Sequence, residues 1–159
     1  MTETYLLTDA ASFIGPIVAE RLRRDGVRVI AADGSFADEG DRLRLTSPEE
    51  TVRKAIALGG RLDAIVIAAA FPAPRTNAET LTAEVTRPFF EKLAIEPLAL
   101  AAAAIPQMRK QGGGRIVMNT SRVTLGKEAR TLYSASKGAA QAMARTWALE
   151  LAGDGITVN

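Results

Sequence analysis

The 159-residue sequence contains no cysteine and no histidine. Without cysteine, a disulfide framework, a thiolate nucleophile and cysteine-bound zinc are excluded. Without histidine, Ser-His-Asp catalysis and imidazole metal ligands are excluded as well, so we expect no metal site. The side chains that remain for proton transfer are tyrosine, lysine, aspartate and glutamate. Aromatic residues make up only 5% of the chain, and the net charge of +2 is too small to favour nucleic acid or an anionic membrane as a partner.

Apolar residues make up 47% of the chain and alanine is frequent, which is typical of a compact soluble α/β protein. A chain of this length is sufficient for one domain, residues 1–159, with its own core. The amino terminus lacks the pattern of a signal peptide. The alanine-rich stretch 93–106 is interrupted by Glu96, Pro97 and Pro106, so we predict no membrane span and expect a cytoplasmic protein.

Apolar runs and helical patterns alternate along the chain. Strands are predicted at 4–8, 27–32, 42–45, 63–69, 115–119 and 156–158. Helices are predicted from Gly15 onward and at 48–58, 79–111 and 131–152. This alternation predicts an α/β fold with a doubly wound, Rossmann-like parallel sheet in a single domain. Because the chain stops on a strand, at Asn159, we expect it to lack a C-terminal part of that fold.

Three residues in the second half of the chain are candidates for proton-transfer chemistry. Ser121 follows the predicted strand 115–119, at the edge where open α/β sheets bind ligands. Tyr133 and Lys137 are four positions apart on the following helix, so their side chains share one face. An ammonium group beside a phenol stabilises the phenolate, which makes a tyrosine usable as acid and base. Ser121 could donate a hydrogen bond to a carbonyl or alkoxide oxygen held between them.

Ser121 and the sequence Tyr-Ser-Ala-Ser-Lys at 133–137 resemble the short-chain dehydrogenase/reductase family. The resemblance implies that Tyr133 is the catalytic acid/base and that Ser121 holds the substrate oxygen. It implies that Lys137 stabilises the ionised tyrosine and binds the nicotinamide ribose. It further implies an oxidoreductase that transfers hydride between NAD(H), less favourably NADP(H), and a small alcohol or carbonyl substrate.

After its first strand the family carries Thr-Gly-x-x-x-Gly-x-Gly, and this chain has Thr-Asp-Ala-Ala-Ser-Phe-Ile-Gly at 8–15. Such a loop brings the backbone close to a pyrophosphate at a helix amino terminus. Gly15 keeps the last glycine. Asp9 places a carboxylate near the phosphates and Phe13 places a ring in cofactor space, so both oppose dinucleotide binding. For a bound nucleotide, the resemblance assigns the contacts to Thr8, Ser12, Phe13, Ile14, Gly15, Asp33, Ala69 and Lys137.

Asp33 ends the second strand 18 residues after Gly15, close to the ~20 expected for the acid that binds a ribose 2′-hydroxyl and selects NAD over NADP. Asp33-Gly34 is equally well explained as a turn dipeptide. Three further stretches depart from the family. Arg-Leu-Thr at 44–46 stands where the family has Asp-Val-Thr, Ile-Ala-Ala-Ala at 67–70 stands where it has Asn-Asn-Ala-Gly, and Leu93 stands where it has a catalytic asparagine.

The pattern Thr-x4-Phe-x-Gly at 8–15 also resembles the halohydrin dehalogenases, relatives that lost the nucleotide and bind halide in its place. The stretches 71–74 and Glu96-Pro97 are similar to that branch. Its arginine is replaced here by Lys137, and its serine-to-tyrosine spacing is one residue longer. Three functions stay open: the NAD-dependent oxidoreductase, then a dehalogenase or epoxide-opening enzyme without cofactor, then a non-catalytic member of the family.

The predicted helices at 90–105 and 131–152 are apolar nearly all round. A helix without a polar face is buried on every side, and one small domain cannot cover both helices. We therefore expect a homodimer or homotetramer that pairs them, as the family resemblance also implies.

Overall fold

A computed structural model describes residues 2–69, 71–72 and 74–159. Within these residues, six strands form one sheet in the order β3-β2-β1-β4-β5-β6, and all neighbouring strands are parallel. Because the strand order reverses between β1 and β4, the predicted doubly wound, Rossmann-like sheet is confirmed. The strands are β1 (Thr4–Thr8), β2 (Arg28–Asp33), β3 (Arg42–Arg44), β4 (Ala64–Ile67), β5 (Gly114–Met118) and β6 (Ile156–Val158).

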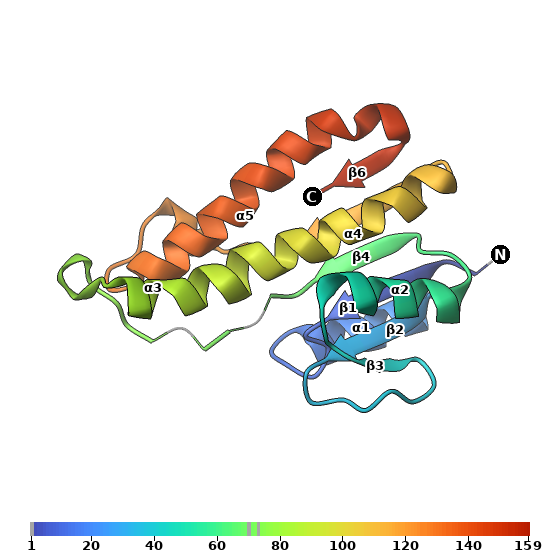
Figure 1. The fold of residues 1–159 in the computed structure, drawn as a ribbon, viewed down its shortest axis with the longest axis horizontal. Helices are drawn as coiled ribbons and strands as arrows, with labels where there is room; N and C mark the ends of the chain where they lie inside the picture. Colours follow the sequence, from blue (N-terminus) through green and yellow to red (C-terminus); the bar gives the residue numbers. More distant parts are fainter. Residues whose placement is uncertain (1, 70, 73) are drawn as a thin grey trace.

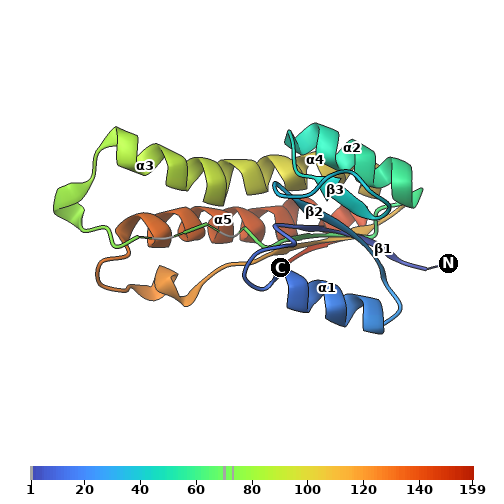
Figure 2. The ribbon, with the colours of Figure 1, turned by 90° about the horizontal axis from the view of Figure 1, so that it is seen from below.

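Helices cover both faces of the sheet (Figures 1 and 2). Helix α1 (Gly15–Arg24) lies on one face, and α2 (Pro48–Gly59), α4 (Glu96–Lys110) and α5 (Thr131–Glu150) lie on the other. Right-handed crossovers produce this arrangement, since the chain moves toward β2 after β1 and in the opposite direction after β3. Short 3₁₀ turns at Ala78–Thr80, Arg122–Leu125 and Ala152–Asp154 connect the longer elements.

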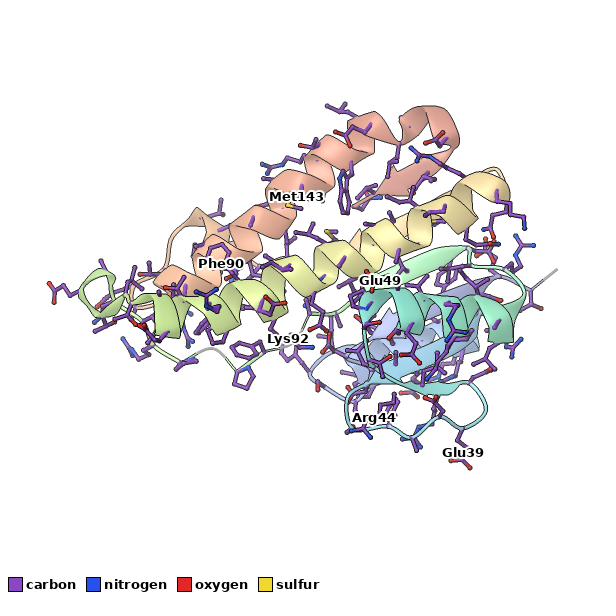
Figure 3. The ribbon with its side chains drawn as sticks, viewed as in Figure 1. Glu39, Arg44, Glu49, Phe90, Lys92 and Met143 are labelled. Carbon is purple, nitrogen blue, oxygen red and sulfur yellow. The ribbon has the colours of Figure 1, made fainter. Side chains whose placement is uncertain are left out.

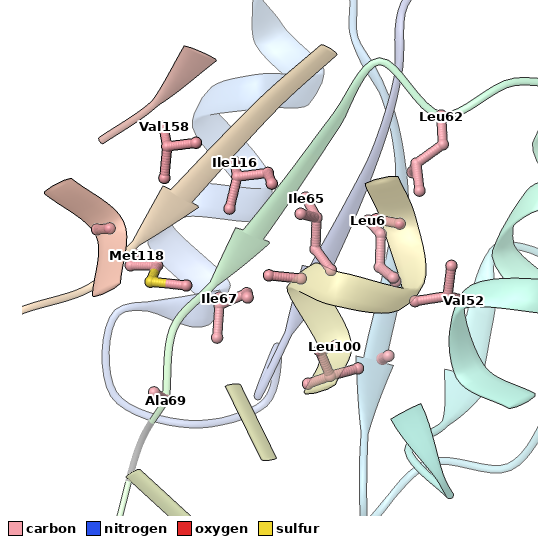
Figure 4. Packing of buried hydrophobic residues seen from close by; sticks show 14 of the residues in the cluster. Leu6, Val52, Leu62, Ile65, Ile67, Ala69, Leu100, Ile116, Met118 and Val158 are labelled. Atoms are coloured by element: carbon pink, nitrogen blue, oxygen red, sulfur yellow. The ribbon is translucent and has the colours of Figure 1, made fainter. Parts of the chain in front are cut away.

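The hydrophobic core lies mainly between the sheet and the three helices on one face (Figure 4). Leu6, Ile65 and Ile116 point into it from three adjacent strands and are fully buried. Leu100 and Met108 of α4 belong to the same cluster and pack against the sheet. A smaller cluster that includes Leu7, Ala19 and Val29 packs α1 against the other face. Strands buried on both faces read as continuous apolar runs, which is why they were predictable from the sequence.

The predicted helix at 79–111 is not continuous. It consists of α3 (Ala83–Phe90), a π turn η2 (Glu91–Ile95) and α4, and η1 (Ala78–Thr80) precedes it. Pro97 has no amide to donate to the preceding turn, and that turn widens so that the Glu96 amide donates to the Glu91 carbonyl. The three segments share one axis, and α3 extends beyond the edge of the sheet (Figure 1).

Both long apolar helices bury one side and expose the other in the single chain. Leu93 and Ala140 are buried, whereas Ile95 is 53% exposed and Leu149 is 83% exposed. The pairing of these helices in an oligomer stays a prediction. No helix in the described part of the chain is long and apolar enough to cross a membrane. Ala70, in the departure noted at 67–70, and Ala73, in the dehalogenase-like stretch 71–74, lie outside the described residues.

Candidate functional site

A cavity of about 490 Å³ opens at the carboxyl edge of the sheet, where ligands bind in folds of this type. Three segments form its walls. They are the loop after β1, with Ser12 and Phe13; the segment after β4, with Ala69, Phe71 and Pro72; and the connection from β5 into α5, with Asn119, Val123, Lys127, Arg130 and Tyr133. Two of these side chains are cationic and none is a carboxylate.

Tyr133 and Lys137 lie together, as their spacing predicts. Tyr133 lines the cavity, and the Lys137 Nζ lies 5.9 Å from the centroid of its ring. Lys137 is fully buried behind it and donates hydrogen bonds to the carbonyl oxygens of Asn119 at 2.6 Å and Ala69 at 3.2 Å. Burial lowers the pKa of Lys137 from 10.5 to about 8, and the nearby Asp9 charge opposes this fall only in part. The pair therefore joins a solvent-accessible phenol to an amine that titrates near neutral pH.

Ser121 lies apart from this pair. It lines a neighbouring hollow that shares Val123 and Lys127 with the main cavity. Its Oγ accepts a hydrogen bond from the Val123 amide at 3.4 Å and so caps the short 3₁₀ turn η3 (Arg122–Leu125). Among the described residues no hydrogen bond joins Ser121 to Tyr133 or Lys137. The structure thus brings two of the three predicted catalytic residues together, and the catalytic roles of all three stay predictions.

The loop after β1 turns without glycine where the family resemblance places two of them. Asp9 and Phe13 both adopt the left-handed backbone region, with φ of +49° and +48°. Phe13 is 79% exposed and forms part of the cavity wall. Gly15 begins α1, and a Cβ there would lie 2.5 Å from the Asp9 carbonyl oxygen, so only glycine fits. Thr8 is fully buried, and its Oγ1 has no hydrogen-bond partner within the described residues.

Asp9 turns its carboxylate inward, where it meets a lysine that the sequence did not single out. Lys92, on η2, places its Nζ 3.7 Å from Asp9 and 2.7 Å from the Glu96 carboxylate. Burial raises the pKa of Asp9, Lys92 opposes this rise, and the charge of Asp33 adds to it. Burial by itself would lower the pKa of Lys92, but the carboxylates of Glu96 and Asp9 outweigh this effect and raise the pKa. A signal for Lys92 was present: it is a cation four positions before Glu96 in a largely apolar stretch of helix.

The segment after β4 is held from two sides. The Asn119 side chain donates to the Ala68 carbonyl at 2.8 Å, and the Ala69 amide lies near the Asp9 carboxylate and lowers its pKa. Ala69 itself is buried with a left-handed φ of +45° (Figure 4 shows it beyond the end of β4). Leu93, where the family has a catalytic asparagine, is fully buried in the core. Asn119 was not singled out from the sequence, although it ends a strand at the ligand-binding edge.

Comparison with known proteins places this geometry in a family. The family model described as short chain dehydrogenase matches residues 36–159. The chain belongs to that family. An uncharacterized oxidoreductase from Thermotoga maritima is 31% identical over 97% of this chain and 68% of its own length. A solved structure titled "Dehalogenation enzyme" superimposes with a TM-score of 0.92 at 28% identity, over 99% of this chain and 70% of that one.

A second solved structure of the family, a halohydrin dehalogenase bound to ethyl (2S)-oxiran-2-ylacetate, superimposes with a TM-score of 0.91 at 25% identity. The match covers 98% of this chain and 68% of that one. The chain therefore spans about two thirds of the length of these relatives. Among the residues described here, no group of three or more carboxylate side chains is arranged to hold a metal ion.

The dinucleotide typical of the short-chain dehydrogenase family does not fit the residues of this loop. Asp33, the predicted ribose contact, has both carboxylate oxygens engaged within the fold: Oδ2 accepts from the Ala11 amide at 3.0 Å and Oδ1 from the Ser35 amide and hydroxyl at 2.9 and 2.7 Å. Burial alone would raise the pKa of Asp33, but the hydrogen bonds from Ser35 and Ala11 outweigh it and hold the pKa below its usual value. The family resemblance places Asp33 at the ribose and Asp9 at the pyrophosphate, so an ionised Asp33 has no free carboxylate oxygen for the ribose and Asp9 sets a carboxylate against the phosphates.

Proposed function

We propose that this protein is a cofactor-independent enzyme of the short-chain dehydrogenase family that closes vicinal halo-alcohols to epoxides and opens epoxides with small anions. One observation carries the proposal. The loop that would hold a dinucleotide instead buries the Asp9 carboxylate and presents Phe13 to the cavity that Tyr133 lines. The two solved dehalogenase structures that share this fold support it.

The proposed reaction needs one proton transfer and one displacement. The Tyr133 phenolate accepts the proton of the substrate hydroxyl, and the resulting alkoxide attacks the neighbouring carbon. A carbon–oxygen bond forms, the carbon–halogen bond breaks, and the halide leaves with the bonding electron pair. Tyr133 then returns the proton to solvent. In the reverse direction an anion attacks the epoxide carbon and Tyr133 donates its proton to the ring oxygen.

The walls of the cavity suit a leaving halide. Phe13, Phe71 and Pro72 give an apolar part to the cavity that Tyr133 also lines, and Phe71 is fixed by an edge-to-face contact with Phe89 at 5.3 Å between ring centroids. Lys127 and Arg130 add positive charge to the same cavity without any carboxylate in its lining. An anion is favoured by this balance because a weakly hydrated apolar wall strengthens its attraction to the cations. Ser121, one hollow away, is proposed to hold the substrate oxygen once substrate reorders its loop.

A hydride-transferring NAD(H)-dependent oxidoreductase is the second candidate. The observation that favours it is Lys137, since the family resemblance implies an arginine in the dehalogenase branch and a lysine in the dehydrogenases. The Thermotoga maritima relative, named an oxidoreductase, also favours it. This candidate requires the loop at 8–15 to rearrange so that Asp9 and Phe13 leave the nucleotide position.

The test measures two signals with one preparation. Bromide release from a vicinal bromo-alcohol is followed as acid production, with Tyr133→Phe as the matched control. NADH and NADPH are titrated separately by nicotinamide fluorescence. Release that is lost in the variant, with no nucleotide binding up to millimolar concentration, supports the dehalogenase. Nucleotide binding without halide release supports the oxidoreductase. If neither halide release nor nucleotide binding is observed, the non-catalytic family member is supported.

A further inference from the structure

We propose that Asp9 is a positioning residue for the Tyr133–Lys137 pair, which it holds through the backbone of Ala69, with Lys92 and Glu96 as its counter-charges. The proposal rests on the use of Tyr133 as acid and base in the proposed function. It adds a role for a carboxylate that the substitution of a loop glycine introduced.

The first step is a continuous set of contacts. The Ala69 amide lies near the Asp9 carboxylate and lowers its pKa, and the Ala69 carbonyl accepts a hydrogen bond from the Lys137 Nζ at 3.2 Å. Ala69 therefore lies between the two charged side chains, with its amide near one and its carbonyl on the other. Its φ of +45° is unfavourable for a residue with a Cβ, so the contacts on both sides help to keep it in place.

The second step is the charge on Asp9. Asp9 is only 9% exposed, and a carboxylate in such surroundings needs a counter-charge to stay ionised. Lys92 supplies it at 3.7 Å and is held in turn by Glu96 at 2.7 Å. The widened turn η2 carries Lys92 on the side of the helix that faces the loop after β1 (Figure 3). Asp33, from β2, also faces Asp9, and its own charge is compensated by the amides of Ala11 and Ser35.

The third step is the effect on the lysine. Lys137 is buried among carbonyl groups, and Asp9 is the charged side chain whose field favours its protonated form. The Lys137 Nζ lies 5.9 Å from the centroid of the Tyr133 ring on the same helix face, so the charge of Lys137 acts directly on the residue proposed as acid and base. An ionised Asp9 therefore keeps the pair ready for proton transfer without touching the substrate.

The test follows the titration of Lys137 by NMR in protein labelled with ¹³C at the lysine Cε, with Lys137→Arg used to assign its signal. Asp9→Asn keeps the size of the side chain and an acceptor for the Ala69 amide but removes the charge. The midpoint of the Lys137 titration, about 8 in the wild type, is expected to fall by on the order of one unit. The basic limb of the halide-release pH profile is expected to move with it.

Two further variants keep the result interpretable. Asp9→Gly is expected to shift the Lys137 midpoint in the same direction, and it relieves the left-handed φ of +49°, so it folds even where asparagine is poorly tolerated. Asp63→Asn is the matched control, because Asp63 is 7% exposed, accepts a hydrogen bond from the Thr4 amide and pairs with Arg61 at the other end of the strands. An unchanged Lys137 midpoint in both Asp9 variants, or an equal shift in Asp63→Asn, overturns the proposal. Absence of halide release would refute the proposed function while leaving the titration result intact.

Discussion

Replacing Lys137 by methionine is expected to abolish a rise in stability that the wild type shows at alkaline pH. The pKa of Lys137 is lowered by burial from 10.5 to about 8. The folded state therefore holds the proton of Lys137 less tightly than the unfolded chain does, and at neutral pH the buried charge destabilises the fold. This difference corresponds to about 3 kcal/mol, at ~1.4 kcal/mol for each pH unit. The side chain is fully buried, so little of that energy is screened by water.

The sign follows from proton counting. Between about pH 8 and pH 10.5 the folded state has released the proton of Lys137 while the unfolded state still binds it, so the free energy of unfolding rises with pH in this window. Lys137→Met removes the titrating group and with it the rise. The variant also loses the hydrogen bonds to the Asn119 and Ala69 carbonyls, which costs free energy at every pH. The slope against pH, and not the absolute stability, is therefore the quantity to compare.

The assay is urea unfolding of both proteins between pH 7 and pH 10.5, with free energies taken from the linear extrapolation. The wild type is expected to gain up to about 3 kcal/mol relative to Lys137→Met across that range. Lys110→Met, which removes an exposed lysine near the end of α4, serves as control and is expected to keep the wild-type rise. Parallel curves for the wild type and Lys137→Met would refute the argument that a buried, destabilised ammonium lies behind Tyr133.

Three further changes test separate parts of the site. Tyr133→Phe keeps the packing of α5 and is expected to lower halide release about 10²- to 10⁴-fold, and near-wild-type turnover would remove the phenol from the mechanism. Gly15→Ala places a methyl group 2.5 Å from the Asp9 carbonyl and is expected to lower the free energy of unfolding by about 1–3 kcal/mol in urea; an unchanged midpoint would mean that the loop yields freely. Phe13→Ala removes a ring that is 79% exposed, so stability is expected to change by less than about 0.5 kcal/mol while the substrate KM rises, and an unaltered KM would place the substrate elsewhere.

The sheet and the Tyr133–Lys137 pair could be predicted from the sequence because both depend on local patterns. Ile30 and Ile65 lie in apolar runs that a sheet covered on both faces explains. The strand of Ile116, in contrast, exposes Val117 on one face. The four-residue spacing on α5 places two side chains on one face whatever surrounds the helix. Element boundaries shifted by one or two residues, as at β4 (Ala64–Ile67), where the predicted strand was longer at both ends.

Contacts between distant charged residues could not be predicted in the same way. Lys92 and Asp9 are far apart in the sequence, and nothing in the sequence around either residue indicates that the two charges pair. Asp33 was equally compatible with a ribose contact and a turn. The Asp33 carbonyl accepts from the Phe36 amide at 3.1 Å and its carboxylate binds Ser35, which supports the turn. For Ser121, the position after a strand could be predicted from the sequence. The direction of its hydroxyl could not, because it depends on the short turn whose Val123 amide the hydroxyl caps.

The widened turn at Glu91–Ile95 sets the rotational phase of everything that precedes it on the long helix. A π turn holds one residue more than the α turn it replaces, which rotates α3 by about 100° about the shared axis. Deleting a single residue from this turn would swing Phe89 away from Phe71 and turn the Lys92 ammonium away from Asp9 at the same time. A length change of one amino acid here would thus alter both the aromatic wall and the ionic support of the cavity.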